Sequence, residues 1–343
     1  MSPDPDDAVE AVAGGSVLSV AMATHDGTRW LPELLASLAA QQRLPDELVV
    51  CDDASIDGTG DVLDAYAATA PFPVRRVDHD VRRGPVRAFE TALGAVEGDV
   101  VALADQDDVW LPEKLLVLEE ALFVHDAELA FTDAVLVDEH ERPTGAHLWG
   151  ELGFTRRQQD SLVDGAPGPL LRHAVVTGCT ALMRRRVVDL ALPFPSALDL
   201  VAEPALHDRW LSKVAGCTGP VQPVPSALVR YRVHAGQVVG ARWDGPVGQV
   251  VDQARRGTAD VRARAEARRR RLDALEARLA ERGVEVEVAV QAQLDDLRNH
   301  LEVRAGLGSR PSRLIPVLGE VLTGGYRRFG RGTASAVLDL LRR

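Results

Sequence analysis

The chain has 343 residues, of which 46% are hydrophobic, so it can bury the core of one large α/β domain with an appended segment. Its net charge of −12 argues against nucleic acid as the main partner, since binding to a phosphate backbone depends on clustered lysine and arginine. The three cysteines lack metal-ligand spacing, no run approaches the about 18 apolar residues of a membrane-spanning helix, and the acidic N-terminal segment lacks a signal pattern, so we expect a cytoplasmic protein.

Four short apolar runs in the first third of the chain alternate with helical patterns. The runs, which we expect to be strands, are Ser16–Ala23, Glu47–Cys51, Phe72–Val77 and Asp99–Ala104. The helical patterns between them are Trp30–Leu38, Asp57–Ala68, with Asp57 as N-cap, and Val86–Val96. This alternation predicts an α/β fold with a mostly parallel sheet, flanked by helices that make right-handed crossovers.

Polar side chains follow three of these strands at their carboxyl ends. The sets are Ala23-Thr24-His25-Asp26 after the first strand, Asp52-Asp53 after the second and Asp105-Gln106-Asp107-Asp108 after the fourth. Ligands of parallel sheets bind beyond the carboxyl ends of the strands. We therefore expect these three sets to converge on one site.

The acidic run that begins at Asp105 is the clearest chemical signal in the chain. Three carboxylates in four residues repel one another, and Mg²⁺ or Mn²⁺ relieves that repulsion while a substrate's phosphates complete its shell. The motif alone leaves open a solvated acidic turn. Neither GxGxxG nor GxxxxGK[ST] is present, so a dinucleotide-binding Rossmann site and a P-loop are disfavoured, and a phosphorylated ligand here needs a bridging metal.

Six stretches occur in a characteristic order. They are residues 23–27 (ATHDG), 49–59 (VVCDDASIDGT), 105–115 (DQDDVWLPEKL), 176–180 (VTGCT), 207–211 (HDRWL) and 231–234 (YRVH). Together they resemble the family 2 glycosyltransferases with the GT-A fold, and the last stretch is similar to the rhamnosyltransferase-like branch. The resemblance covers about Ser16 to Ala241.

The resemblance also implies an organisation of the chain. It predicts a disordered tail at 1–15 and a GT-A catalytic domain at 16–241. Within that domain it implies a nucleotide-sugar half at 16–130 and an acceptor half at 131–241. A helical extension follows at 242–343.

Roles for individual residues follow from the resemblance, position by position. The implied nucleotide-binding set is Ala23, His25, Asp26, Asp52, Asp53, Arg83, Arg87 and Asp105. The implied ligands of a divalent cation, Mn²⁺ or Mg²⁺, are Asp105, Asp107 and His234. The implied contacts to the donor sugar and the acceptor are Asp108, Trp110, Gly178, His207, Trp210 and Arg232.

Asp208 is the implied catalytic base. Glycosyl transfer with inversion needs a base on the face of the sugar opposite the leaving diphosphate, because an acceptor hydroxyl is a poor nucleophile. Asp208 opens a helical stretch, Asp208–Ala215, where the helix dipole favours its anion. A plain N-cap is the structural alternative for this residue. For His234, a packed or surface histidine is the alternative, and Cys179 and Cys217 are expected to be core thiols.

The C-terminal region is helical and basic, with 19 arginines and 12 acidic residues from Arg255 to Arg343. Apolar stripes at 261–279 and 286–301 predict a helical hairpin, which we expect to dock on the catalytic domain. The last segment, 314–343, interleaves apolar residues with arginines and could lie on an anionic membrane surface as a peripheral contact.

The resemblance favours a dTDP- or UDP-sugar donor, with dTDP-rhamnose foremost, and a glycan or lipid-linked saccharide acceptor in cell-surface polysaccharide biosynthesis. Two other functions stay open. A sugar-1-phosphate nucleotidyltransferase would carry a glycine-rich loop after the first strand, which this chain lacks. A non-catalytic sugar-nucleotide or glycan-binding module would have lost the metal or base carboxylate, yet Asp107 and Asp208 are both present.

Overall fold

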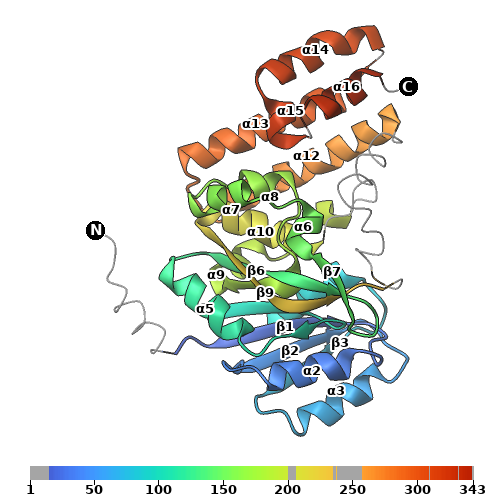
Figure 1. Cartoon of the computed structure of the whole chain (residues 1–343), viewed down its shortest axis with the longest axis vertical. Helices are drawn as coiled ribbons and strands as arrows, with labels where there is room; N and C mark the ends of the chain where they lie inside the picture. Colours follow the sequence, from blue (N-terminus) through green and yellow to red (C-terminus); the bar gives the residue numbers. More distant parts are fainter. Residues whose placement is uncertain are drawn as a thin grey trace.

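The computed structural model describes residues 15–199, 206–234, 237, 257–308, 310–330 and 332–341. The predicted N-terminal tail, apart from its last residue, lies outside this range, as do Arg331, Arg342 and Arg343. The described residues form a nine-stranded sheet flanked by helices, with five further helices at their C-terminal end (Figure 1).

The four predicted strands are confirmed and pair in parallel in the order β3-β2-β1-β4. Their bounds are β1 Leu18–Thr24, β2 Glu47–Asp52, β3 Val74–Asp78 and β4 Val100–Asp105. The intervening helices are α2 Leu31–Ala39, α3 Thr59–Ala67 and α4 Pro85–Ala95. Asp57 was expected as the N-cap of α3, but the N-cap is Gly58, and Asp57 instead accepts a hydrogen bond from the Thr59 backbone N–H at 3.0 Å.

Alternate residues of each strand enter different cores, because successive side chains of a strand point to opposite faces. Val20 and Met22 pack with α2, α3 and α5 (Lys114–Val124) on one face. Ala21 packs with α4 on the other face. Both faces are therefore covered, as expected for a parallel sheet.

The second half of the domain extends the same sheet in the order β4-β8-β6-β9-β5, with β7 paired to β6. Its strands are β5 Val109–Trp110, β6 Leu129–Val137, β7 Pro143–His147, β8 Ala181–Arg184 and β9 Val221–Arg232. Its helical segments are α6 Leu148–Leu152, α7 Arg156–Val163, α8 Gly168–Arg172, η1 Gly178–Thr180, α9 Arg185–Ala191, η2 Ser196–Asp199 and α10 His207–Thr218. Strand β8 is antiparallel to both neighbours, so one mixed sheet runs through both predicted halves.

The predicted C-terminal hairpin is α12 (Thr258–Glu281) followed by α13 (Val288–Ala305), and it docks on the catalytic domain as expected. Leu272, Leu275 and Leu294 are buried in the same cluster as Trp210. In Figure 1 these orange helices lie over the end of the domain that carries α7, α8 and α10.

Three short helices complete the chain: α14 Arg310–Leu322, α15 Gly325–Phe329 and α16 Thr333–Leu341. Arg313, directly before the segment 314–343 for which a membrane contact is predicted, is buried and donates hydrogen bonds to the Gly308 and Asp339 carbonyls and to the Thr258 hydroxyl. None of the helices placed by the structure has the length and apolarity needed to cross a bilayer.

Candidate active site

A cavity of about 350 Å³ opens at the carboxyl ends of β1, β2 and β4, facing the start of α10 and the end of β9. It brings together most of the residues that the sequence singled out. Those that line it are Ala23, His25, Asp53, Asp105, Asp107, His207, Asp208 and His234. Strand register explains the convergence, because Ala23 pairs with Cys51 on one side and with Asp105 on the other.

Gln106 ties the acidic run to the loop after β1. Its side-chain carbonyl accepts the His25 backbone N–H and its amide donates to the His25 carbonyl, both at 2.9 Å. The paired hydrogen bonds hold His25 beside the acidic run. Sequence reasoning passed over Gln106 because an amide between carboxylates carries no charge signal of its own.

Asp52 and Asp53 have different tasks. Asp52 is buried and accepts hydrogen bonds from the hydroxyls of Thr24 and Ser55, so it supports the turn, as expected. Asp53 faces the cavity while its oxygens accept the backbone N–H groups of Arg83 at 2.8 Å and Gly84 at 2.7 Å. Burial alone would raise the pKa of Asp53, but the hydrogen bonds from His79 and these two amides outweigh it and lower the pKa.

Besides Asp52, three further members of the predicted nucleotide-binding set do not line the cavity: Asp26, Arg83 and Arg87. The Asp26 carboxylate accepts a hydrogen bond from the Ile56 N–H at 2.9 Å, which links the turn after β1 to the turn after β2. Arg87 forms ion pairs with Glu90 and Asp199 on the far side of α4. At the cavity wall the arginine is Arg82, not Arg83.

Asp107 and His234 meet at the cavity wall, from the loop after β4 and the end of β9. The His234 Nε2 lies 2.8 Å from Asp107 Oδ2, and its ring packs against Trp30 at a tilt of 43°, with centroids 4.1 Å apart. Burial is the main cause that raises the pKa of Asp105 to about 7, and the charges of Asp107 and Asp208 contribute to the same rise. Carboxylates that repel one another beside an imidazole nitrogen are a donor set that Mn²⁺ or Mg²⁺ fits.

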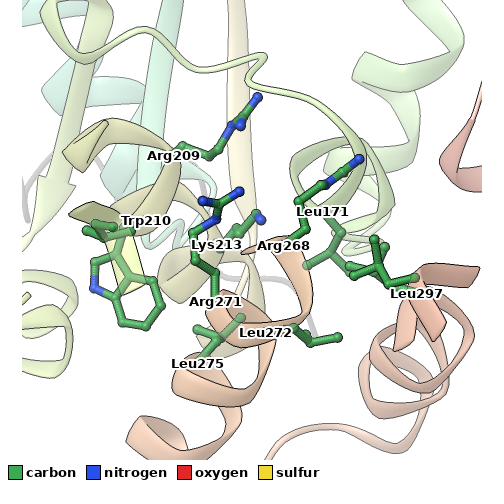
Figure 2. Close-up of a pocket in the computed structure, with 11 residues that line it drawn as sticks. Leu171, Arg209, Trp210, Lys213, Arg268, Arg271, Leu272, Leu275 and Leu297 are labelled. Atoms are coloured by element: carbon green, nitrogen blue, oxygen red, sulfur yellow. The ribbon is translucent and has the colours of Figure 1, made fainter. Parts of the chain in front are cut away.

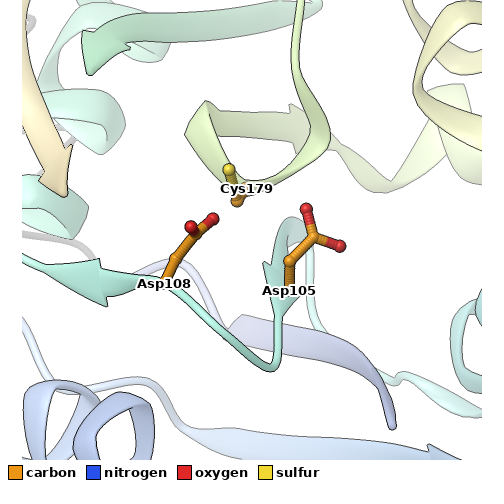
Figure 3. A group of neighbouring side chains, drawn as sticks. All are labelled: Asp105, Asp108 and Cys179. Atoms are coloured by element: carbon orange, nitrogen blue, oxygen red, sulfur yellow. The ribbon is translucent and has the colours of Figure 1, made fainter. Parts of the chain in front are cut away.

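A second cluster lies beneath the cavity floor, where ligand atoms of Asp105, Asp108 and Cys179 come within 4.8 Å of one another (Figure 3). Asp108 and Cys179 are buried and do not line the cavity. The pKa of the Asp108 carboxyl and the pKa of the Cys179 thiol are both raised well above their ordinary values. Burial is the largest cause, and the charges of neighbouring aspartates add to it. Because Asp107 and His234 line the cavity that a substrate can enter, they are the better candidates for a cation that also binds a substrate's phosphates.

Asp108, expected near the sugar, points into the protein instead, and its Oδ1 accepts the Arg232 backbone N–H at 3.0 Å. Arg232 was also expected at the sugar. Its side chain is 1% exposed and donates to the Asp107 carbonyl at 2.8 Å and the Glu139 carbonyl at 3.2 Å. Arg232 therefore fixes the acidic run from behind.

The two predicted sugar-contacting tryptophans lie in the core. Trp110 is 2% exposed and packs its ring against the Lys114 ammonium. Trp210 is also 2% exposed and donates its indole N–H to the Ala191 carbonyl at 3.0 Å. Both predictions failed because large aromatic side chains provide core area as readily as they provide sugar contacts.

Asp208 lies in the first turn of α10, which begins one residue before the predicted helix start, and the N-cap is Leu206 rather than Asp208. Its carboxylate accepts the Gly178 N–H at 3.2 Å and the Arg209 N–H at 2.6 Å, which connects two predicted acceptor-side motifs. Burial is the main reason why the pKa of Asp208 is raised. A carboxylate with a raised pKa, held at a cavity wall, is suited to accept a proton.

His207 stacks on Phe89 with ring centroids 3.7 Å apart, and burial lowers its pKa to about 3. Neither ring nitrogen has a hydrogen-bond partner among the residues that the structure places. The neutral ring therefore forms an apolar wall beside Asp208. Sequence reasoning missed Phe89 because its position in the apolar stripe of α4 is that of a core residue.

Comparisons with known proteins agree with this geometry. The family described as Glycosyl transferase family 2 matches residues 19–190. The uncharacterized glycosyltransferase alr2836 of Nostoc sp. is 29% identical over 223 residues, which are 63% of this chain and 65% of that protein. The uncharacterized protein Rv1520 of Mycobacterium tuberculosis is 31% identical over 220 residues, 64% of this chain and 59% of that protein. The chain thus covers less than two thirds of either relative.

The crystal structure of S. aureus TarS 1-349 in complex with UDP shares the fold, with a TM-score of 0.51 at 17% identity over 94% of this chain and 90% of that one. Because the family match spans half of the chain and includes the strands that build the cavity, the chain belongs to glycosyl transferase family 2.

Proposed function

We propose that the chain transfers a sugar from a nucleoside diphosphate sugar to a glycan or lipid-linked acceptor, with inversion, in cell-surface polysaccharide biosynthesis. One observation carries this proposal: Asp53, the Asp107–His234 pair and Asp208 line a single cavity from three sides. Two relatives support the pathway by their names, the abequosyltransferase RfbV of Salmonella typhimurium and the succinoglycan biosynthesis protein ExoO of Rhizobium meliloti.

The proposed donor site is the half of the cavity built by β1, β2 and β4. Asp53 is held ionised where it can accept a hydrogen bond from a nucleotide base, and Ala23 and His25 lie beside it. Solved structures of similar fold include TarS with UDP-GlcNAc and the Pyrobaculum calidifontis mannosyltransferase PcManGT with GDP-Man and Mn²⁺. We propose a dTDP- or UDP-sugar for this chain, with dTDP-rhamnose first because of the 231–234 motif.

Asp107 and His234, with Asp105 beside them, would hold the divalent cation. When bound, it would act as a Lewis acid that stabilises the departing diphosphate. Arg232 holds the backbone of the acidic run through the Asp107 carbonyl, and Gln106 ties that run to His25. Asp208 would take the proton of the acceptor hydroxyl, and the Gly178 amide keeps its carboxylate oriented.

Two substitutions test the proposal. Asp107→Ala should weaken Mn²⁺-dependent binding of UDP or dTDP at least about tenfold, as measured by calorimetric titration. Asp208→Asn should retain that binding and lower kcat for sugar transfer at least about a hundredfold. Nucleotide binding that is indifferent to chelator would contradict the metal site.

The same assays separate the alternatives. A non-catalytic module would bind the nucleotide and transfer no sugar from any of a panel of nucleotide sugars. A nucleotidyltransferase would form a nucleotide sugar from a sugar 1-phosphate and a nucleoside triphosphate. Either result would replace the proposed function.

We also propose a peripheral contact with the inner face of the cell membrane. The helices α14 and α16 expose an apolar set, Leu314, Ile315, Leu318, Leu322, Val337 and Leu341. On α14 these residues have the spacing of one helix face. Liposome flotation of the wild type against Ile315→Ser/Leu322→Ser tests the contact, and equal flotation of the two proteins would exclude it.

A further inference from the structure

A second hollow, of about 1070 Å³, lies between the catalytic domain and the C-terminal helices. One wall comes from α7, α8 and the segment after α8, and the other from α13 and α15. We call this hollow the seam groove. It shares Leu152, Ala174 and Arg209 with the catalytic cavity, so the two spaces adjoin.

The seam groove is basic in a chain that is acidic. Five arginines line it, and the carboxylates among its lining residues are Glu151 and Asp296. The arginines are Arg157, Arg172, Arg209, Arg327 and Arg328. The catalytic cavity next to it is lined by four aspartates, so the sign of the charge changes where the two spaces meet.

The fold holds these arginines from both walls. Arg172 donates to the Gly330 carbonyl, which joins α8 to the end of α15. Arg328 pairs with Asp296 of α13, whereas Arg157 and Arg327 are exposed at the rim. Arginine presents a planar set of donors that matches carboxylate and phosphate oxygens.

More positive charge lies behind the groove, at the junction of α10 and α12. Figure 2 shows the charged ends of Arg209, Lys213, Arg268 and Arg271 gathered above an apolar floor of leucines. The space among them is only about 10 Å³, about the size of one water molecule. This space is therefore too small to be a ligand site of its own.

We propose that the seam groove binds the acceptor, and that the acceptor is an anionic glycan whose carboxylates or phosphates are held by these arginines. The inference rests on the proposed function and names its acceptor class. Arg209 follows the proposed base Asp208 directly and lines both spaces. An acceptor anion bound by Arg209 therefore brings a nearby hydroxyl of the same acceptor toward Asp208. The volume of the groove suits several sugar units.

The test compares four labelled probes on the full chain: an oligogalacturonate, a glycerol phosphate oligomer, a short polyprenyl diphosphate sugar and neutral maltotetraose. We expect at least one anionic probe to bind at low salt and to weaken as salt is raised. The first three probes distinguish uronate, phosphodiester and lipid diphosphate as the source of the anion. Equal binding of maltotetraose would overturn the proposal.

Arg157→Glu/Arg327→Glu should weaken binding of the anionic probe at least tenfold, and Arg157→Gln/Arg327→Gln should weaken it less. The matched control is Arg156→Glu, which changes the neighbouring exposed residue of α7, outside the groove. Mn²⁺-dependent UDP binding should be unchanged in all three variants. If UDP binds and no anionic probe responds to the groove variants, the inference fails while the proposed function stands. If neither UDP nor dTDP binds the wild type, the proposed function fails.

Discussion

At the scale of single residues, the charge of Asp105 links the site to the stability of the protein. Its pKa of about 7 in the folded chain exceeds that of an aspartate in an unfolded chain, about 3.9. Between these values the folded state binds more protons than the unfolded state. The contribution of Asp105 to stability is therefore present below about pH 4 and is lost as the pH rises through about 7.

A divalent cation bound beside Asp105 should restore the stability that is lost at high pH, and this gives the first prediction. The gain in melting temperature on adding Mn²⁺ should be larger at pH 8 than at pH 6, because repulsion among the cavity carboxylates is greatest when Asp105 is ionised. Differential scanning fluorimetry measures this gain. Asp107→Ala is the control and should abolish it. An equal gain at both pH values would show that the cation binds away from Asp105.

The second prediction concerns Arg232, which supports the metal site without lining the cavity. Arg232→Lys should lower Mn²⁺ affinity about 10- to 100-fold, because one ammonium cannot bond the Asp107 and Glu139 carbonyls as the fork of Arg232 does. Calorimetric titration of Mn²⁺ measures the change. Arg230→Lys, on the exposed side of the same strand, is the control and should leave affinity near wild type.

Sequence reasoning located the charged residues of the site better than its aromatic ones. Carboxylates at strand ends have few structural uses, so Asp53 and Asp107 were predicted at the cavity, and the family resemblance implied Asp208 there as the base. Trp110 and Trp210 were misplaced because nothing local distinguishes an aromatic residue of the core from one that contacts sugar. Arg232 was assigned to the wrong face for a similar reason, since its partners come from segments about a hundred residues away.

At the scale of elements, the hairpin of α12 and α13 packs into the hydrophobic core of the catalytic domain. The periodicity of its apolar stripes predicted both helices and their buried faces. It could not predict the seam groove, because a groove depends on how two distant surfaces are set against each other. The alternation of strands and helices likewise predicted β1 to β4, whereas the antiparallel insertion of β8 had no local signal.

The third prediction follows from this docking. Leu294 is 0% exposed and packs in the cluster that contains the face of the sheet covered by α4. Leu294→Ala should lower the free energy of unfolding by about 2–5 kcal/mol, since it leaves a cavity in that core. The midpoint of urea denaturation, followed by the fluorescence of the buried tryptophans, measures the loss.

Val288→Ala on the same helix is the matched control for Leu294→Ala. Val288 is 87% exposed, so its truncation should change stability by less than about 0.5 kcal/mol. If both variants unfold at the wild-type midpoint, α13 does not share a cooperative core with the sheet.

At the scale of the whole molecule, the buried cores differ in size. Two large clusters fill the two faces of the sheet, and one of them extends into α12 and α13. A third cluster holds only five fully buried apolar residues, Val261, Leu307, Val317, Tyr326 and Ala336. Helices α14 to α16 pack on this small cluster, and only Phe329 of their described residues reaches a large one. The buried Asp339 accepts hydrogen bonds from Arg304 and the Tyr326 hydroxyl, each at 2.9 Å.

The fourth prediction is that α14 to α16 open locally at a lower free energy than the sheet does, because local opening exposes less apolar surface there. Hydrogen exchange followed by mass spectrometry should show faster exchange in 310–341 than in β1 and β4. Tyr326→Phe removes one hydrogen bond to Asp339, worth about 1 kcal/mol, and should speed exchange in α16 about fivefold while β1 is unchanged. Exchange at one common rate in the sheet and in α14 to α16 would mean that the chain opens as a single cooperative unit. The C-terminal wall of the seam groove would then move only with the catalytic domain.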